Sequence, residues 1–151
     1  MGDKRPKYRL GRIIGAYLRT RKGTKELHPA VIVTPDQEII QPADFDPRRG
    51  GENVVVVVGV STKYALYNDP YVKLPFATPL HPVTGLNKDC AAIIGWYDLI
   101  HIEDDCTFKA GDVPRALMTQ INERIRSDLL NRLGKEYKTM AEIVPILFPG
   151  E

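Results

Sequence analysis

The side chains that could perform chemistry in this sequence are few, and they do not form a familiar catalytic or metal-binding motif. The three histidines, His28, His81 and His101, lie far apart, and none has a metal-binding partner at short spacing. The phosphate loop GxxxxGK with Ser or Thr, the dinucleotide fingerprint GxGxxG, the zinc motif HExxH and the nucleophile elbow GxSxG are all absent. We therefore expect chemistry that needs neither a metal nor a nucleotide cofactor.

Two further groups of polar and reactive side chains have plainer explanations. The acidic run Glu103-Asp104-Asp105 could hold a cation, but such a run is more often a solvated turn. Cys90 and Cys106 are 16 residues apart with no CxxC pairing. We expect them to be reduced thiols that serve packing.

Positive charge is concentrated at the beginning of the chain. Residues 1–25 carry nine lysines and arginines and one acid, a net charge of +8, although the whole chain carries only +2. The remaining residues therefore carry a net charge of −6. Such an asymmetry points to a polyanionic partner at the basic end. A solvated strand face together with a basic terminal arm over residues 1–9 would produce the same composition.

Length and composition predict one globular domain over residues 1–151. With 43% hydrophobic and 26% charged residues, the chain lacks the composition of a disordered tail. Its longest apolar run, residues 54–58, is far shorter than the roughly 20 residues that a membrane span needs. The beginning of the chain also lacks the apolar core of a secretory signal. We expect a cytoplasmic protein with no membrane partner.

Short strands are predicted over the first two thirds of the chain. The run at residues 53–61 is the strongest of these signals because it is almost entirely valine. Residues 19–27 read as a polar, basic loop, and the Pro- and Gly-containing residues 41–52 as a longer one. The predicted strands are residues 11–18, 30–34, 53–61, 71–74, 90–94 and 98–102.

Helical periodicity appears only after these strands. Apolar residues recur every four positions, at Val113, Leu117, Ile121, Ile125 and Leu129. Asp112 is the predicted N-cap, Pro114 falls in the first turn, and Gly134 is a C-terminal stop. Strands followed by one helix indicate an α+β, mainly β fold: a small, partly open barrel closed by a C-terminal helix. Residues 135–151 form a tail.

Four short segments carry a resemblance to a known family. His28-Pro29-Ala30-Val31-Ile32-Val33 is similar to a family segment RPAVVLS, and residues 58–62 (VGVST) to VPITS. Residues 71–75 (YVKLP) are similar to HVPLP, and residues 84–92 (TGLNKDCAA) to TGLKKDSVA, the most specific of the four. In this order, the segments resemble the MazF/PemK-like toxins of type II toxin–antitoxin systems. The correspondence runs from about residue 11 to residue 133.

The resemblance implies a fold, an activity and partners. The fold would be an SH3-like barrel of the CcdB/MazF type, present as a homodimer with a cognate antitoxin protein. The activity would be sequence-selective, metal-independent cleavage of single-stranded RNA, in particular mRNA. In that reaction the 2′-hydroxyl attacks the adjacent phosphorus and leaves a 2′,3′-cyclic phosphate and a 5′-hydroxyl.

The resemblance also implies catalytic residues. A family Ser/Thr pair matches Ser61 and Thr62, whose hydroxyls would hold the scissile phosphate; the plain alternative is that they cap a strand or a turn. The family's catalytic arginine falls on His28, which is the main departure. An imidazole titrates near neutral pH and suits acid–base work, but it cannot make the bidentate phosphate contact of an arginine.

Basic and aromatic side chains near these positions are the predicted RNA contacts. The loop before His28 could supply the displaced positive charge, and Glu26 is a rough stand-in for a family Glu or Gln there. Tyrosines after Ser61 could stack on bases, as could Trp96, for which packing is the competing explanation. The predicted RNA-binding residues are Arg19, Arg21, Lys22, Lys25, Lys63 and Tyr64.

Two other functions remain open. Loss of the family arginine would permit a catalytically inactive RNA-binding or regulatory module on the same barrel. A gyrase-directed toxin on the related barrel is the second alternative, and it predicts a protein partner instead of RNA.

The sequence also departs from the family at a second place. The family has an Asp-Gln pair after its fifth strand, and this chain has Gly95-Trp96-Tyr97-Asp98 in that stretch.

Overall fold

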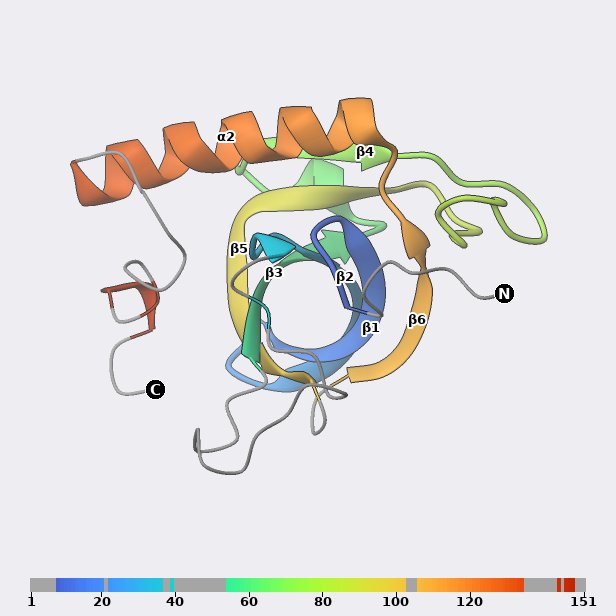
Figure 1. The fold of residues 1–151 in the computed structure, drawn as a ribbon, viewed down its shortest axis with the longest axis horizontal. Helices are drawn as coiled ribbons and strands as arrows, with labels where there is room; N and C mark the ends of the chain where they lie inside the picture. Colours follow the sequence, from blue (N-terminus) through green and yellow to red (C-terminus); the bar gives the residue numbers. More distant parts are fainter. Residues whose placement is uncertain are drawn as a thin grey trace.

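The computed structural model describes residues 8–20, 22–36, 39, 54–102, 106–134, 144 and 146–148. Six strands, one 3-10 turn and one long helix make up the described fold (Figure 1). They are β1 (Arg12–Arg19), β2 (Lys25–Ile32), β3 (Val54–Ser61), η4 (Tyr64–Leu66), β4 (Tyr71–Leu74), β5 (Cys90–His101), β6 (Cys106–Asp112) and α2 (Arg115–Leu133).

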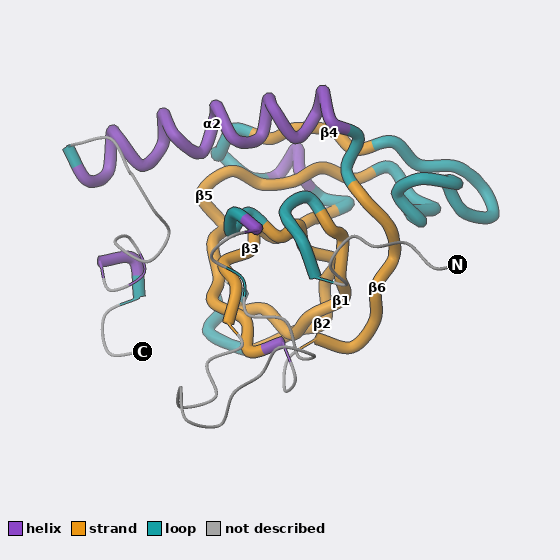
Figure 2. Tube along the Cα trace, in the orientation of Figure 1, coloured by secondary structure: helices purple, strands orange, loops and turns teal. Residues whose placement is uncertain are grey.

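The six strands form one antiparallel sheet in the order β4-β5-β3-β2-β1-β6. The sheet curls round on itself into a barrel, and α2 runs across its outside beside β4 and β5 (Figures 1 and 2). Strands β4 and β6 form the two edges, so the barrel is partly open. The predicted fold, a mainly β barrel closed by a C-terminal helix, is confirmed.

Strand β3 lies near the middle of the sheet, between β2 and β5, which explains its unbroken run of valines. Successive side chains on a strand point to opposite faces. Val56, Val58 and Val60 accordingly join the apolar cluster beneath α2, while Val55 and Val57 join a second cluster on the other face. Burial on both faces removes the polar alternation that a half-exposed strand would show.

Helix α2 packs one face on the sheet and ends where the sequence predicts. Its buried residues are Met118, Ile121, Ile125 and Leu129. Gly134 takes the left-handed conformation with φ of 72°, and its N–H donates to the carbonyl of Leu130 at 2.8 Å. Glycine favours this C-terminal position because it has no Cβ to collide with the backbone.

The predicted helix start is wrong by two residues, since α2 begins at Arg115. Asp112 is the last residue of β6, and its carboxylate accepts a 2.7 Å hydrogen bond from Arg9 instead of capping α2. Pro114 occupies the N-cap position. Arg9 is only 8% exposed, so it belongs to the folded barrel and not to a free basic arm. Residues 1–7 lie outside the described part of the chain.

Strand β2 is longer than predicted. It begins at Lys25 because its pairing with β1 continues from Ile13 opposite Val31 down to Arg19 opposite Lys25. Both ends of the predicted loop over residues 19–27 therefore belong to strands: Arg19 ends β1, and residues 25–27 begin β2. Backbone pairing does not require apolar side chains, and the exposed end of this hairpin gives no hydrophobic signal.

Strand β5 is a single bent strand where the sequence predicts two. Gly95, with φ of 110°, lies at the bend, and the register with β3 shifts between Val58 and Val60. The Trp96 ring fills the space above Gly59, where a Cβ would overlap it. Strand β6 was not predicted, because its sequence CTFKAGD has no apolar run; irregular pairing with β1 defines it.

Several sequence predictions concern residues outside the described part of the chain. These are the loop at 41–52, the acidic run at 103–105 and most of the tail at 135–151. Cys90 is buried and free, as expected. None of the helices in the described part of the chain combines the length and apolar character that crossing a bilayer requires.

Candidate functional site

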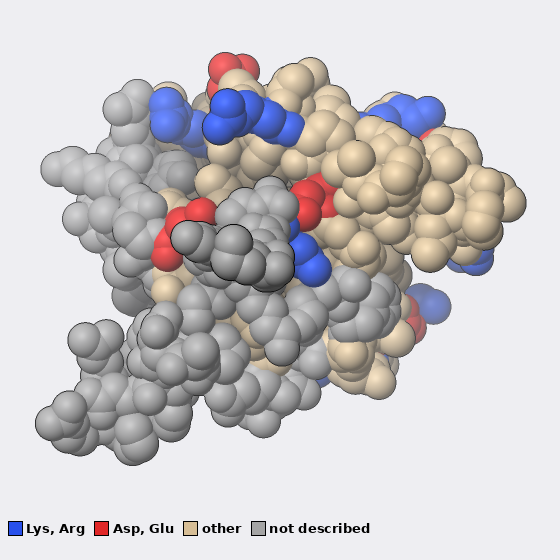
Figure 3. Space-filling model, turned by 45° about the vertical axis from the view of Figure 1, so that its right-hand side comes forward, with Lys and Arg blue, Asp and Glu red and all other residues tan. Residues whose placement is uncertain are grey.

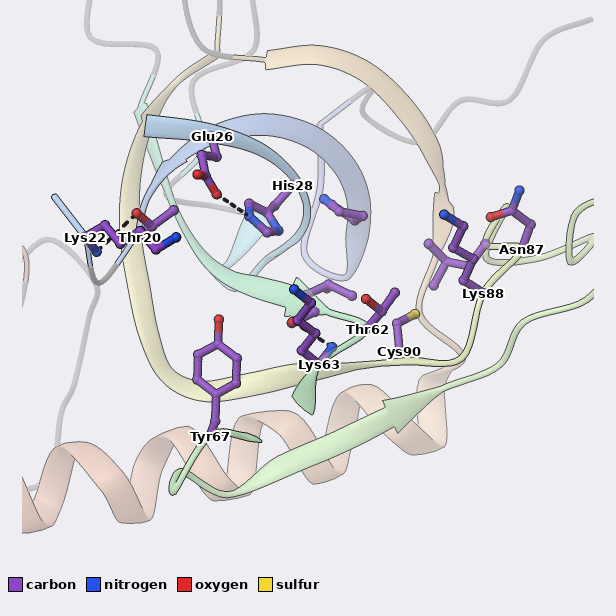
Figure 4. A pocket seen from close by; sticks show the side chains of 14 residues that line it. Thr20, Lys22, Glu26, His28, Thr62, Lys63, Tyr67, Asn87, Lys88 and Cys90 are labelled. Carbon is purple, nitrogen blue, oxygen red and sulfur yellow. Dashed lines mark hydrogen bonds and ion pairs between the residues drawn. The ribbon is translucent and has the colours of Figure 1, made fainter. Parts of the chain in front are cut away.

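A pocket of about 520 Å³ lies at the rim of the barrel and brings the three predicted catalytic residues together (Figure 4). His28 comes from β2, and Ser61 and Thr62 come from the end of β3 and the turn after it. Strands β2 and β3 are neighbours in the sheet, with Ala30 opposite Gly59. This pairing brings residues more than thirty positions apart in the sequence to one cavity.

His28 is held between a carboxylate and an indole. Its Nε2 lies 3.6 Å from the Glu26 carboxylate, which projects from the same face of β2 because the two residues are two apart. The imidazole also meets the Trp96 ring edge to face, with centroids 5.0 Å apart. The His28 side chain remains 25% exposed, so it is fixed in position and still reachable from the pocket.

Trp96 is a supporting wall for His28. Its Nε1–H donates a 2.9 Å hydrogen bond to the carbonyl of Arg19, and its ring packs on Gly59. The indole therefore bridges β1, β3 and β5 at the bend of β5. These contacts account for Trp96 by packing, the alternative that the sequence left open.

Ser61 shapes the turn that carries the next two pocket residues. Its side chain is buried, and its Oγ accepts a 3.0 Å hydrogen bond from the N–H of Lys63. Thr62 and Lys63 are exposed and line the pocket. Ser61 thus has the turn-stabilising role considered as the plain alternative, and it lines the pocket as well.

One wall of the pocket consists of residues that the sequence analysis did not predict as site residues. Leu86, Asn87, Lys88 and Cys90 line the pocket from the segment before β5 (Figure 4). They lie in the TGLNKDC stretch, which carried the most specific part of the family resemblance. The resemblance of this stretch to the family segment was the one signal in the sequence that could have identified these pocket residues.

The first residues of this stretch hold the wall in place. The Thr84 hydroxyl donates to the carbonyl of Pro75 at 2.8 Å and accepts the N–H of Leu86 at 3.1 Å. Gly85 has φ of 71°, and a Cβ there would overlap the backbone carbonyl of Ala110 in β6. The loop before β5 is therefore pressed directly against β6 at a position that requires glycine.

Only some of the predicted RNA-binding residues line the pocket. Lys22 and Lys63 line the pocket and are joined there by Lys88. Arg19 lies beside it, lining an adjacent cavity. Lys25 is exposed on β2 and is not among the pocket residues. Arg21 lies outside the described part of the chain.

Tyr64 is turned away from the pocket, and Tyr67 lines it in its place. The Tyr64 hydroxyl donates to Asp89 at 2.8 Å, and its ring packs on Tyr71 with centroids 4.8 Å apart. The hydrogen bond from Tyr64, with the hydrogen bond and charge of Lys73 as further causes, lowers the pKa of the Asp89 carboxyl. Tyr64 therefore belongs to an exposed polar cluster with Asp89 and Lys73 beside the pocket.

The electrostatic character of the pocket is cationic. Of the described residues that line it, three are lysines and one, Glu26, is acidic. On the face shown in Figure 3, uncharged residues dominate the right-hand side, and Lys and Arg lie mostly near its edges. Burial raises the pKa of the Cys90 thiol to about 11, so this side chain is a neutral part of the wall at neutral pH. The described residues contain no group of three or more metal-ligating side chains.

Comparisons with known proteins identify the fold. The sequence matches no family model and no curated protein. Among solved structures, MazF (Form-I) from Deinococcus radiodurans is similar, with a TM-score of 0.56 and 12% identity over 84% of this chain and 96% of that one.

Two further solved structures are similar at a TM-score of 0.50. The Mycobacterium tuberculosis toxin MazF-mt6 has 16% identity over 83% of this chain and 99% of that one. A MazE-MazF structure (Form-II) from Deinococcus radiodurans has 10% identity over 80% and 93% of the two chains. At such identities the likeness concerns the fold: this chain has a MazF-type fold, as its sequence segments predicted.

Proposed function

We propose that this protein is a toxin-type endoribonuclease that cleaves single-stranded RNA, with mRNA as its natural substrate, in the pocket that contains His28. The observation that carries the proposal is the convergence of His28, Ser61 and Thr62 with three lysines in one cavity of a MazF-type fold. Neither a cationic pocket nor the fold alone would indicate this chemistry. Together they supply a phosphate-binding charge and a group able to move a proton.

Substrate binding falls to the lysines and hydroxyls. Lys22, Lys63 and Lys88 attract the phosphates of the RNA backbone, and Thr62 donates a hydrogen bond to a phosphate oxygen. Ser61 accepts the N–H of Lys63, but a hydroxyl has its own proton to donate as well. In this role the lysines supply the positive charge that the family arginine would otherwise bring.

Catalysis begins when the imidazole of His28 accepts the proton of the ribose 2′-hydroxyl. The 2′-oxygen then bonds to the adjacent phosphorus, and the bond between phosphorus and the 5′-oxygen breaks. A lysine ammonium of the pocket donates the proton that this 5′-oxygen needs. The products are a 2′,3′-cyclic phosphate and a 5′-hydroxyl.

Charge stabilisation completes the mechanism. Glu26, 3.6 Å from Nε2 of His28, stabilises the imidazolium that forms when the proton is transferred. The lysines stabilise the extra negative charge of the phosphorane. These groups require no metal ion, so we propose a metal-independent reaction.

The proposed partners follow from the same fold. We propose a homodimer that binds a cognate antitoxin protein in the cytoplasm, where mRNA is available. Support for an antitoxin comes from the similar MazE-MazF structures. The cleavage is proposed to be selective for a short RNA sequence, and the whole chain of 151 residues to be a single domain of this kind.

The test is incubation of the purified protein with single-stranded RNA in excess EDTA, with analysis of the new ends. We expect cyclic phosphate and 5′-hydroxyl ends, and a rate reduced about 10²–10⁴-fold by His28→Ala. His101→Ala is the matched control, because His101 is an exposed histidine of β5 that does not line the pocket. Absence of cleavage, or equal rates for both variants, overturns the catalytic proposal. Salt-sensitive RNA binding without cleavage would instead indicate the inactive binding module.

A further inference from the structure

A second cavity of about 320 Å³ adjoins the His28 pocket. Thr20 and Tyr67 line both cavities, and the second is completed by Arg19, Asp69, Gly95 and Trp96. The contact between His28 and Trp96 also joins a residue of the first cavity to a residue of the second, with ring centroids 5.0 Å apart. A nucleotide whose phosphate lies beside His28 therefore has its neighbouring base within reach of the second cavity.

Tyr67 and Trp96 form the aromatic wall of this cavity. The Tyr67 and Trp96 rings are nearly parallel, 20° apart in plane, with centroids separated by 6.0 Å. Trp96 is held by its hydrogen bond to Arg19 and by its packing on Gly59. The separation leaves no room for a base between the two rings, so a base would stack on the accessible surface of Tyr67. A platform already in place adds affinity because little side-chain freedom is lost on binding.

The polar groups of the cavity match the edge of a base. Asp69 offers carboxylate oxygens, which accept N–H donors and have more than one lone-pair site. Arg19 offers guanidinium N–H donors, which pair with the O6 and N7 acceptors of guanine. Guanine carries both adjacent N–H donors and these acceptors on its edges, whereas uracil has a single ring N–H.

Gly95 lines the cavity where the Arg132 guanidinium approaches the bend of β5. A Cβ at this position would lie 2.8 Å from Nη2 of Arg132 and 3.5 Å from Oδ1 of Asp69. Its φ of 110° also disfavours any side chain. A side chain at this position would therefore collide with the Arg132 guanidinium, and the bend of β5 requires glycine beside the cavity.

We propose that the second cavity is a base-binding subsite that takes one guanine next to the scissile phosphate. Tyr67 stacks on the guanine ring, and Asp69 and Arg19 bond to its edges. This inference rests on the proposed ribonuclease function and names the residues that set its sequence preference.

The first experiment varies the RNA and leaves the protein unchanged. The ligand is a short single-stranded RNA that the wild-type protein cleaves, with a 2′-deoxy nucleotide at the cut so that it binds without being cleaved. One abasic nucleotide is placed at each position in turn, and the affinity of the wild-type protein is measured for each of these RNAs. We expect loss of one guanine flanking the cut to weaken binding about 5- to 150-fold, the range for one stacked base. Equal affinity for every abasic position on both sides of the cut overturns the inference.

The second experiment varies the subsite. Tyr67→Ala should lower kcat/KM by a similar factor, while Tyr67→Phe, which keeps the ring, should retain the wild-type value. Tyr64→Ala is the matched control, because Tyr64 belongs to the same loop but lines neither cavity. If Tyr67→Ala and Tyr64→Ala have equal effects, the subsite is wrong.

Base preference provides a readout that a purely structural role would not change. Sequencing the ends cut from random single-stranded RNA should show a guanine preference at one position for the wild type, relaxed at that position alone by Asp69→Asn. A wild type that cleaves with no such preference overturns the inference and leaves the proposed function intact. A wild type that neither binds nor cleaves RNA overturns both.

Discussion

Ser61 and Lys63 are joined by a hydrogen bond at the rim of the pocket, and this bond closes the turn from which Lys63 faces the cavity. The N–H of Lys63 donates to Ser61 Oγ, which turns the chain directly after β3. Lys63 and Thr62 then line the cavity, while Tyr64, one residue further on, bonds to Asp89 outside it. At the residue scale, the position of a side chain in this turn therefore decides whether it lines the cavity.

Each pocket lysine should contribute separately to RNA binding. Replacing Lys22, Lys63 or Lys88 by Gln should weaken binding and reduce the slope of log K against log salt by about 0.7, the value for one phosphate contact with a single strand. Fluorescence anisotropy with labelled single-stranded RNA over a salt series measures the slope. Lys73→Gln is the control, because Lys73 pairs with Asp89 at 3.3 Å outside the pocket. An unchanged slope for all three variants would remove the lysines from the binding surface.

At the scale of elements, the wall before β5 depends on its contact with β6. Gly85 lies where the loop meets the backbone of Ala110, and Thr84 secures the loop to Pro75. The pocket residues that follow take their positions from this contact; they are Leu86, Asn87, Lys88 and Cys90. In the family-like segment, the first residues therefore hold the loop in place and the later ones line the pocket.

Gly85→Ala should destabilise the protein more than Gly23→Ala. Both glycines have positive φ, 71° and 82°, so each substitution costs about 1–2 kcal/mol of backbone strain. Gly85→Ala adds the overlap with Ala110, whereas nothing lies within 4 Å of a Cβ at Gly23. Urea denaturation of both variants measures the difference in the free energy of unfolding. Equal losses of stability would contradict the close packing of the loop on β6.

At the scale of the whole molecule, α2 is tied to the bend of β5 that also forms the second cavity. The Tyr97 hydroxyl donates to Asp128 of α2 at 2.6 Å, and Arg132 pairs with Asp128 at 2.8 Å. Arg132 also lies over the Tyr97 ring, 5.6 Å from its centroid, and close to Gly95. The helix that covers the barrel therefore supports the strand from which Trp96 projects.

Stability should fall at alkaline pH because of Tyr97. Burial, with the hydrogen bond and charge of Asp128 as further causes, raises the pKa of Tyr97 far above its ordinary value. A tyrosine whose pKa is higher in the folded state stabilises the protein fully below its unfolded pKa of about 10, and this contribution is lost as pH rises further. The free energy of unfolding should thus decrease above pH 10.

Tyr97→Phe separates this effect from general alkaline denaturation. The variant should be less stable at neutral pH by about 1.5–3 kcal/mol, the range for a hydrogen bond to a charged group. Its stability should also decline less steeply above pH 10 than that of the wild type. Tyr17→Phe is the control, since Tyr17 is exposed on β1. Parallel pH profiles for the wild type and Tyr97→Phe would show that Tyr97 does not titrate in this way.

Much of the fold could be predicted because its signals are local. The valines of β3 and the four-residue period of α2 identify elements without reference to the rest of the chain. Strand β6 and the early part of β2 escaped prediction because pairing with β1 creates them, and their own sequences have no apolar pattern. The bend of β5 was not predicted either, because a glycine such as Gly95 within a strand pattern also indicates the end of a strand.

By itself, the sequence determined the mainly β barrel, its C-terminal helix and the candidates His28, Ser61 and Thr62. Only the tertiary structure decided that these three share a cavity, that Lys88 joins Lys22 and Lys63 there, and that Tyr67 faces it. The physical reason is the range of the interactions. Residue type and periodicity act within a few positions, whereas the cavity is assembled by pairing between β2, β3 and β5 and by the contact of Gly85 with β6.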